Sequence, residues 1–83
     1  MNLVLVNGRE QEFLDRWDQI MRDLGPHAPD YKMQQLHFHD NCLRSDLMRK
    51  VNEKWVDASD DEHEHRSLEY MRKQVVRRLY AGS

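Results

Sequence analysis

Residues 30–56 read DYKMQQLHFHDNCLRSDLMRKVNEKWV, and this stretch decides the fold because it is the longest run with helical periodicity. Apolar residues that recur every three or four positions form one face of an amphipathic helix. We therefore expect a single long helix over about 30–56, in the middle of the chain. Its expected core stripe consists of Met33, Leu36, Leu43, Leu47, Val51 and Trp55.

The first half of this predicted helix is apolar on two faces. At about 100° per residue, Tyr31, Phe38 and Cys42 project on nearly the opposite side from the core stripe. One face can pack on a neighbouring helix, and the other needs a second partner. Asp40 falls within the core stripe, where an unpaired carboxylate would be very costly. The expected partners of Asp40 are His37, Arg44 or Arg72, in a structural polar network rather than an acid-base pair.

Two further helices are expected on either side. Asn7 and Glu10 have capping-box spacing, and the apolar periodicity that follows stops at Gly25, which predicts a helix over about 8–24. Ser59 and Glu62 have the same spacing and predict a helix over about 60–81. The expected core of that last helix is Leu68, Met71, Val75 and Leu79. The fold class is therefore all-α, a three-helix antiparallel bundle.

The N-terminal residues 1–6, MNLVLV, are expected to form a short extended arm. A lone strand leaves its backbone groups unpaired, so two interpretations stay open. The arm lies in a groove of its own bundle, over Tyr31, Phe38 and Cys42, or it pairs with a second subunit or another sheet edge. The candidate oligomer contacts are Leu3, Val4, Leu5, Val6, Tyr31, Phe38 and Cys42.

Length and composition predict one domain, residues 1–83, with the arm followed by a helical bundle over 7–83. Charged residues make up 34% of the chain and hydrophobic residues 39%. This balance predicts a thin core and makes oligomerisation an expectation. The lone Cys42 cannot form an internal disulfide, and the apolar N-terminal run is too short for a signal or membrane segment. We therefore expect a cytoplasmic protein with no membrane association.

The histidine clusters resemble a zinc site only in composition. His37 and His39 are two residues apart in the sequence, and so are His63 and His65. Side chains at that spacing point to nearly opposite sides of a helix. His39 and Cys42 are three apart and are the weak metal candidates, with a site between subunits left open. We expect no cofactor, no metal within one chain and no catalytic residues, because no glycine-rich loop or nucleophile with an adjacent base is evident.

A second stripe on the C-terminal helix faces away from the expected core. It consists of Arg66, Tyr70, Lys73, Arg77 and Tyr80, at spacings of 4, 3, 4 and 3. The helix macrodipole explains acids at the start and bases at the end of this helix, but not two tyrosines among the bases. Tyr and Arg dominate interface hot spots, so an acidic protein surface is the first expected partner. A nucleic acid is the second and another copy of this chain is the third.

These patterns predict a small non-enzymatic interaction protein. It is expected to dock on a larger protein or complex and to modulate it as an adaptor or inhibitor, as a homo-oligomer such as a homodimer. The alternative is a nucleic-acid-binding regulator that uses the same stripe with support from Arg44 or Arg49. A formal net charge of −2 and the acidic run before the stripe weaken that alternative.

Overall fold

In the computed structural model, which describes residues 3–60 and 62–81, the chain is all-helical, and those residues contain no strand. They form four α-helices instead of the predicted three. Two positions of the expected arm, 1 and 2, lie outside the described residues. Across the two described ranges, no helix is long and apolar enough to cross a membrane. The α-helices are α1 Glu10–Leu24, α2 Tyr31–Cys42, α3 Arg49–Asp57 and α4 Leu68–Ala81, and the 3₁₀ turns are η1 Gly25–His27, η2 Asp46–Met48 and η3 Glu64–Arg66.

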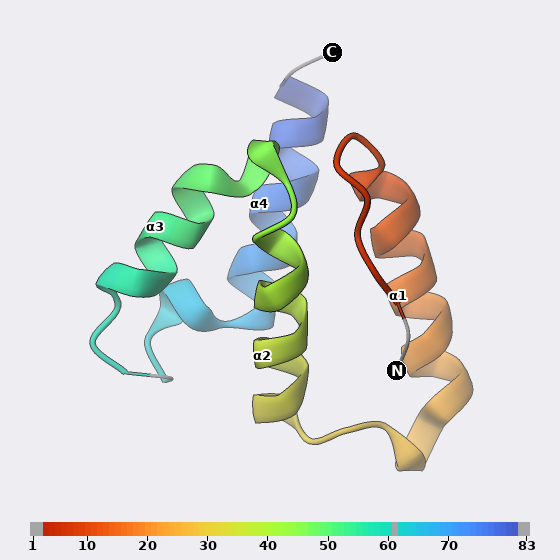
Figure 1. The fold of residues 1–83 in the computed structure, drawn as a ribbon. Coiled ribbons are helices and arrows are strands. Elements are labelled where there is room, and N and C mark those ends of the chain that lie inside the picture. Colours follow the sequence, from red (N-terminus) through yellow and green to blue (C-terminus); the bar gives the residue numbers. More distant parts are fainter. Residues whose placement is uncertain (1–2, 61, 82–83) are drawn as a thin grey trace.

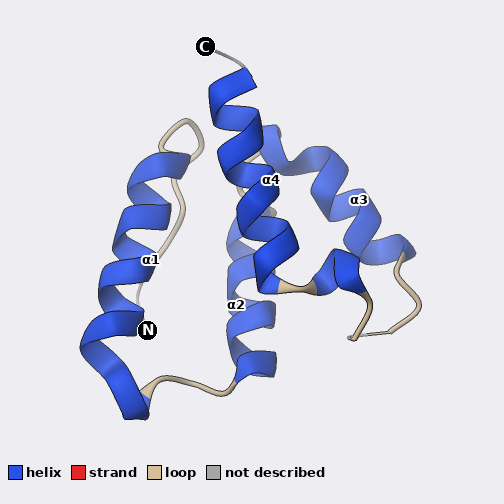
Figure 2. Ribbon diagram, turned by 180° about the vertical axis from the view of Figure 1, so that it is seen from behind, coloured by secondary structure: helices blue, strands red, loops and turns tan. Residues whose placement is uncertain are grey.

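The helices form a slab measuring 33 × 31 × 17 Å. Helix α1 runs antiparallel to α2 and α4, which point in the same general direction (Figures 1 and 2). The N-terminal arm passes between α1 and α2, and α3 lies on the far side of the molecule from α1 (Figure 1). Because α3 provides the return path, α2 and α4 can lie parallel, whereas the predicted hairpin of two long helices would have made them antiparallel.

The helix predicted over 30–56 is broken near its middle. Helix α2 ends at Cys42, and Ser45 adopts an extended backbone, with φ −113° and ψ 122°. The chain then resumes through η2 into α3, which starts at Arg49. The prediction of one continuous helix was therefore wrong, because the periodicity of the apolar residues does not register a change of direction between two helical segments.

The break is held by buried hydrogen bonds to the N-terminal segment. The Leu5 backbone N–H donates to Asn41 Oδ1 at 2.8 Å, and Ser45 Oγ donates to Glu10 Oε1 at 2.7 Å. Asn41, Ser45 and Glu10 are all almost completely buried. A buried polar group that lacks a partner destabilises the fold, so these pairs act as constraints on where the chain can turn.

Both predicted capping boxes were wrong. Asn7 does not cap α1, because its side chain exchanges two hydrogen bonds with Asp46, at 3.0 and 3.1 Å. Helix α4 begins at Leu68 and not near 60, and Ser67 Oγ accepts a hydrogen bond from the Tyr70 backbone N–H at 3.1 Å. Ser59 lies exposed in the loop after α3. A tertiary partner thus replaced the cap predicted at Asn7, whereas α4 has a local serine cap that is provided by Ser67 instead of Ser59.

The buried face of α2 is the one that carries Phe38 and Cys42. Phe38 and Cys42 lie in the core, at 1% and 0% exposure, where Phe38 meets Trp17 edge-to-face at 5.0 Å. Arm residues Leu3 and Leu5 belong to the same cluster. The arm therefore packs against its own chain, on the side that carries Phe38 and Cys42. The core is made of Leu3, Leu5, Phe13, Leu14, Trp17, Phe38, Cys42, Met48, Val51, Trp55, Met71 and Val75.

Three residues of the predicted core stripe lie at the surface. Met33, Leu36 and Leu43 are 56%, 46% and 59% exposed, so their assignment to the core was wrong. Asp40 is exposed as well and needs no buried partner. The predicted core network of Asp40 with His37, Arg44 or Arg72 was therefore wrong. The physical reason is that the arm occupies the groove beside Phe38 and turns that side of α2 inward.

Ser45→Ala tests the constraint at the break. The change leaves the buried Glu10 carboxylate without the hydroxyl donor, and we expect a loss of about 1–3 kcal/mol in the free energy of unfolding. Urea unfolding monitored by circular dichroism measures it. The matched control is Ser59→Ala in the exposed loop, which should change stability by less than about 0.5 kcal/mol. Equal effects of the two changes would contradict a structural role for Ser45.

Candidate functional site

The predicted basic and aromatic stripe is divided between two structural settings. Arg66 lies in η3 rather than on α4, and its guanidinium donates from Nε to the Trp55 carbonyl at 3.0 Å and from Nη2 to the Ala58 carbonyl at 3.2 Å. The same group lies 5.1 Å from the centroid of the Trp55 ring. These carbonyls belong to the C-terminal end of α3, where a cation is favourable. Arg66 is therefore engaged within the chain.

Tyr70 is also engaged within the chain. Its side chain is half-buried against the core, and its ring lies 4.9 Å from the ring of His65. Arg66 and Tyr70 thus fasten η3 and the start of α4 to the rest of the fold. Both side chains are half-buried, whereas Lys73, Arg77 and Tyr80, which follow them in the stripe, are exposed.

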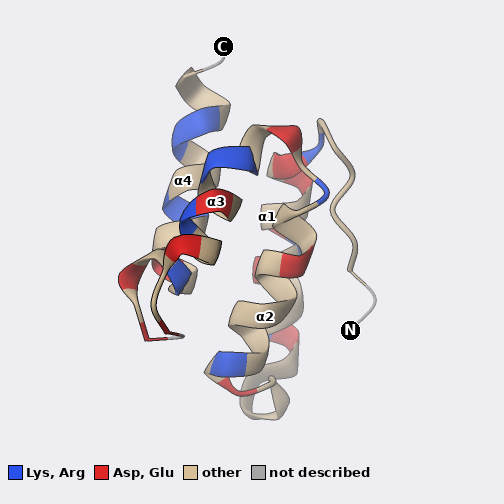
Figure 3. Cartoon of the chain, turned by 60° about the vertical axis from the view of Figure 1, so that its left-hand side comes forward, with Lys and Arg blue, Asp and Glu red and all other residues tan. Residues whose placement is uncertain are grey.

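The second half of the stripe lies at the surface of α4. Lys73, Arg77 and Tyr80 are exposed, and Val76 lies half-buried among them. We call these four residues the α4 outer face. A shallow groove of about 700 Å³ runs along it and is lined by Glu69, Arg72, Lys73, Val76 and Arg77. Bands of basic residues along α4 can be followed in Figure 3. This face offers two cations and an aromatic ring around an apolar floor.

Two other arginines of α4 are paired within the chain, Arg72 and Arg78. Arg72 makes a two-pronged hydrogen-bonded ion pair with Asp18 of α1, and these hydrogen bonds raise the pKa of the guanidinium above its ordinary value. Arg78 donates to Gln74 Oε1 at 2.5 Å. The Arg72–Asp18 pair links α4 to α1 on the side next to the outer face.

Cys42 is buried and His39 is half-buried, both next to apolar groups. The His39 ring stacks on Trp55 at 4.0 Å, with an angle of 6° between the ring planes. Burial, and then the charge of Arg66, lower the pKa of His39. Burial raises the pKa of the Cys42 thiol to about 12, which disfavours the thiolate that a metal would require. Within residues 3–60 and 62–81, no three His, Cys, Asp or Glu side chains come together as a metal site.

His37 lies in a different part of the fold from His63 and His65. His37 stacks on Trp17 at 5.9 Å, on the side of α2 that faces α1. His63 and His65 lie together beyond the end of α3, with ring centroids 4.7 Å apart. The two histidine clusters serve as flat packing groups in different parts of the fold.

The candidate oligomer contacts are distributed between the interior and the surface. Leu3, Leu5, Phe38 and Cys42 are buried within their own chain, whereas Val4 and Val6 are 52% and 58% exposed. Tyr31 is 46% exposed, but its hydroxyl donates to Glu69 Oε2 at 2.8 Å and accepts from the Leu68 backbone N–H at 3.1 Å. Burial and the hydrogen bond to Glu69 raise the pKa of Tyr31. Tyr31 therefore joins the starts of α2 and α4.

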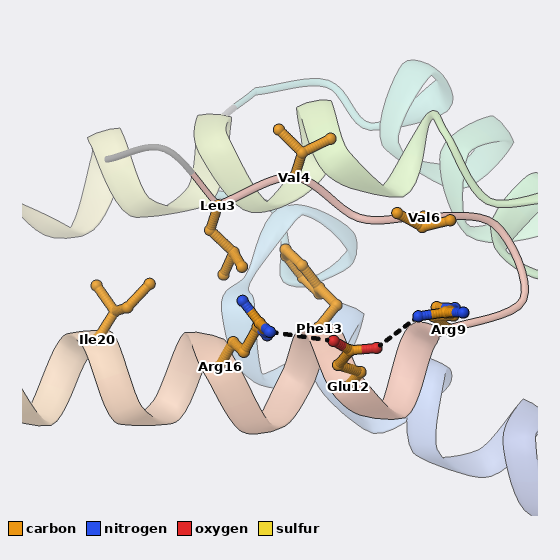
Figure 4. Close-up of a pocket in the computed structure, with 8 residues that line it drawn as sticks. All are labelled: Leu3, Val4, Val6, Arg9, Glu12, Phe13, Arg16 and Ile20. Atoms are coloured by element: carbon orange, nitrogen blue, oxygen red, sulfur yellow. Dashed lines mark ion pairs between the residues drawn. The ribbon is translucent and has the colours of Figure 1, made fainter.

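A groove of about 460 Å³ lies between the arm and α1 (Figure 4). Glu12 lies on its α1 wall between Arg9 and Arg16, with nitrogen-to-oxygen distances of 3.6 and 3.3 Å. Leu3 and Phe13 line its apolar part, and no Ser, Cys or His is among the described residues that line it. The carboxylate of Glu12 thus pairs with two guanidinium groups on one wall, and Leu3, Val4 and Phe13 give the groove an apolar lining.

One surface was missed by the sequence interpretation. The exposed side of α2 carries Met33 and Leu36, and exposed Leu43 follows directly after the helix; periodicity had assigned all three to the core. The available signal was that the first half of this helix is apolar on two faces. A second signal was the polar pair Ser45 and Asp46, typical of a helix start, in the middle of the predicted helix.

Comparison of the chain with protein-family models, with curated proteins and with solved structures finds no match. The α4 outer face and the exposed side of α2 are therefore interpreted from their own chemistry.

Replacing Arg66 distinguishes a structural role from a binding role. Arg66→Ala removes the donors to two carbonyls and the contact with Trp55, and we expect a loss of about 1–3 kcal/mol in stability. Arg77→Ala, on the α4 outer face, should change stability by less than about 0.5 kcal/mol. Thermal and urea unfolding of the two proteins give the comparison. If the Arg66→Ala protein is as stable as the Arg77→Ala protein, Arg66 has no structural role.

Acidification should weaken the fold through His39. Its folded-state pKa lies below the ordinary value, so the unfolded chain binds the proton more readily. The contribution of neutral His39 to the free energy of unfolding is present at neutral pH. It is lost as pH falls from about 6.5 through the folded-state pKa. His39→Phe keeps a ring against Trp55. When the pH is lowered from about 7.5 to 5.5, its free energy of unfolding should fall less than that of wild type.

The control for the titration is His27→Asn in the exposed turn η1, which should retain the wild-type pH dependence. Urea unfolding at several pH values measures all three proteins. Parallel stability profiles for His39→Phe and wild type would contradict the assignment to His39.

Proposed function

We propose that this chain is a small non-enzymatic interaction protein that docks on an acidic surface of a larger protein and modulates it. The proposed docking surface is the α4 outer face, made of Lys73, Val76, Arg77 and Tyr80. The observation that carries the proposal is the exposure of Lys73, Arg77 and Tyr80 on one side of α4. The other two arginines of this helix, Arg72 and Arg78, are paired within the chain.

The chemistry of this face matches an acidic protein surface. Arg77 can bind a carboxylate through two parallel hydrogen bonds, and Lys73 adds a point charge one turn away. Tyr80 is 69% exposed. It supplies a large ring of the kind that anchors protein interfaces. Val76 provides apolar contact between the charged groups, so a partner would meet cations, a ring and an apolar floor together.

Helix α4 holds this face in a fixed orientation. Its opposite side buries Met71 and Val75 completely, and Arg72 ties it to Asp18 of α1. A surface on a rigid helix loses little conformational entropy when it binds, which favours recognition by a compact domain. This rigidity supports a docking role more than the wrapping of a flexible ligand.

A nucleic acid is the alternative partner. Two exposed bases and a tyrosine also suit phosphate contact and base stacking. The chain nevertheless has a formal charge of −2, and the loop before α4 carries Asp60, Glu62 and Glu64. Long-range attraction to phosphates is therefore weak. The balance of charge favours a protein partner.

Affinity capture from lysate of the native cell tests the proposal. We expect Lys73→Glu with Arg77→Glu to abolish capture of the partner, because the exposed bases are replaced by acids that repel its acidic groups. Tyr80→Ala should weaken binding by about tenfold or more, if measured with the purified partner. Capture should survive nuclease treatment of the lysate.

The matched control is Lys50→Glu with Lys54→Glu. These lysines are exposed on α3, and the double change alters the net charge by the same amount. The proposal requires that this control still captures the partner. Equal loss with both double variants would mean that binding depends on overall charge, and loss on nuclease treatment would identify a nucleic acid instead.

A further inference from the structure

The outward side of α2 is unusually apolar for a surface that nothing in the described part of the chain covers. Met33 and Leu36 are 56% and 46% exposed there, and Leu43 continues the row at the end of the helix with 59% exposure. The inward side, by contrast, buries the amides of Gln35 and Asn41. A helix that turns amides inward and large apolar groups outward is expected to have a second packing partner.

Two opposite charges flank the middle of this row. Lys32 and Asp40 lie four residues before and four residues after Leu36, and all three side chains are exposed. Leu36 lies at the centre of α2, which spans Tyr31–Cys42. Each charge is about 6 Å along the helix axis from Leu36 and about 40° around it, in opposite senses.

This arrangement is complementary to itself. A two-fold axis that lies between two facing copies of α2, level with Leu36 and perpendicular to both helices, makes them antiparallel and reverses the position of each residue along the helix. It therefore brings Lys32 of one chain level with Asp40 of the other, diagonally across the line of contact, because each side chain lies only about 40° from that line. It also brings the two Leu36 side chains together at the centre.

We propose that a second copy of this chain docks antiparallel on the exposed side of α2, with the two-fold axis at Leu36. The interface has Leu36 at its centre and two Lys32–Asp40 ion pairs, one on each side. Met33 and Leu43 extend the apolar contact along the helix. The proposal does not depend on the α4 outer face, which belongs to another helix.

The partner is a second copy because the charge pattern selects one. An unrelated apolar surface would fit Met33 and Leu36 equally well, but it would not in general offer an anion and a cation in the reversed order. Lys32 also makes a contact within its own chain. Its ammonium group has three donors, so a pairing across the axis adds to that contact.

The proposed contact is small. Helix α2 is about 18 Å long, so its exposed side is below the roughly 800 Å² per partner of a standard interface. A contact of this size predicts a weak dimer, with a Kd of roughly micromolar or higher, and therefore a concentration-dependent one.

Charge exchange across the axis tests the geometry. Lys32→Glu or Asp40→Lys alone places like charges opposite each other twice, and we expect either to raise the dimer Kd about tenfold. The double variant Lys32→Glu with Asp40→Lys restores both ion pairs in reversed order and should return the Kd to near the wild-type value. Sedimentation velocity over a concentration series measures all four proteins.

The centre of the contact is tested by Leu36→Glu, which should raise the Kd at least about a hundredfold because two carboxylates meet at the axis. The control is Val56→Glu on α3, where Val56 is 73% exposed, and the dimer should persist. Circular dichroism confirms that each variant remains folded, as expected for changes at exposed positions.

Three results would overturn the proposal. They are a wild-type protein that stays monomeric up to about 1 mM, a Leu36→Glu protein that dimerises like wild type, and a double charge exchange that fails to recover the dimer. Loss of the dimer would not affect the capture experiment with α4 variants unless the partner itself requires a dimer. A Leu36→Glu monomer that still captures the partner separates the two proposals.

Discussion

The hydrogen bonding between the N-terminal segment and the break after α2 is the constraint on which the rest of this structure depends. The Leu5 backbone N–H meets Asn41, and Ser45 meets Glu10, in each case with the polar groups almost fully buried. A short chain with a thin core has little apolar surface to spare, so a few buried polar pairs contribute a large share of its stability. These pairs fix the arm in its groove, and the arm in turn completes the core with two leucines.

The rotation of α2 follows from that constraint. Once the arm lies beside Phe38 and Cys42, that side of the helix is inward, and Met33 and Leu36 must face outward. The same event gives the molecule its exposed apolar surface. Packing at the N-terminus thus creates the surface through which we infer that two copies meet, although the arm itself remains within its own chain.

The C-terminal part of the chain shows how one sequence pattern can serve two purposes. Arg66 and Tyr70 hold η3 and α4 against α3 and the core, while Lys73, Arg77 and Tyr80 stay at the surface. The division occurs because α4 begins at Leu68, after a turn, so that Arg66 is no longer on the helix that carries the others. Position along the chain gave no sign of this division, since the spacing is regular from end to end.

The sequence by itself determined the helical class, the ends of the first helix to within two residues, and the core positions Val51, Trp55, Met71 and Val75, because apolar periodicity reports on one helix at a time. It also determined which residue types could form a binding stripe. Only the tertiary structure decided where the middle helix breaks, which side of α2 is buried and which half of the stripe is exposed. Those outcomes depend on hydrogen bonds and contacts between residues far apart in the chain, such as Leu5 with Asn41, and no local pattern encodes them.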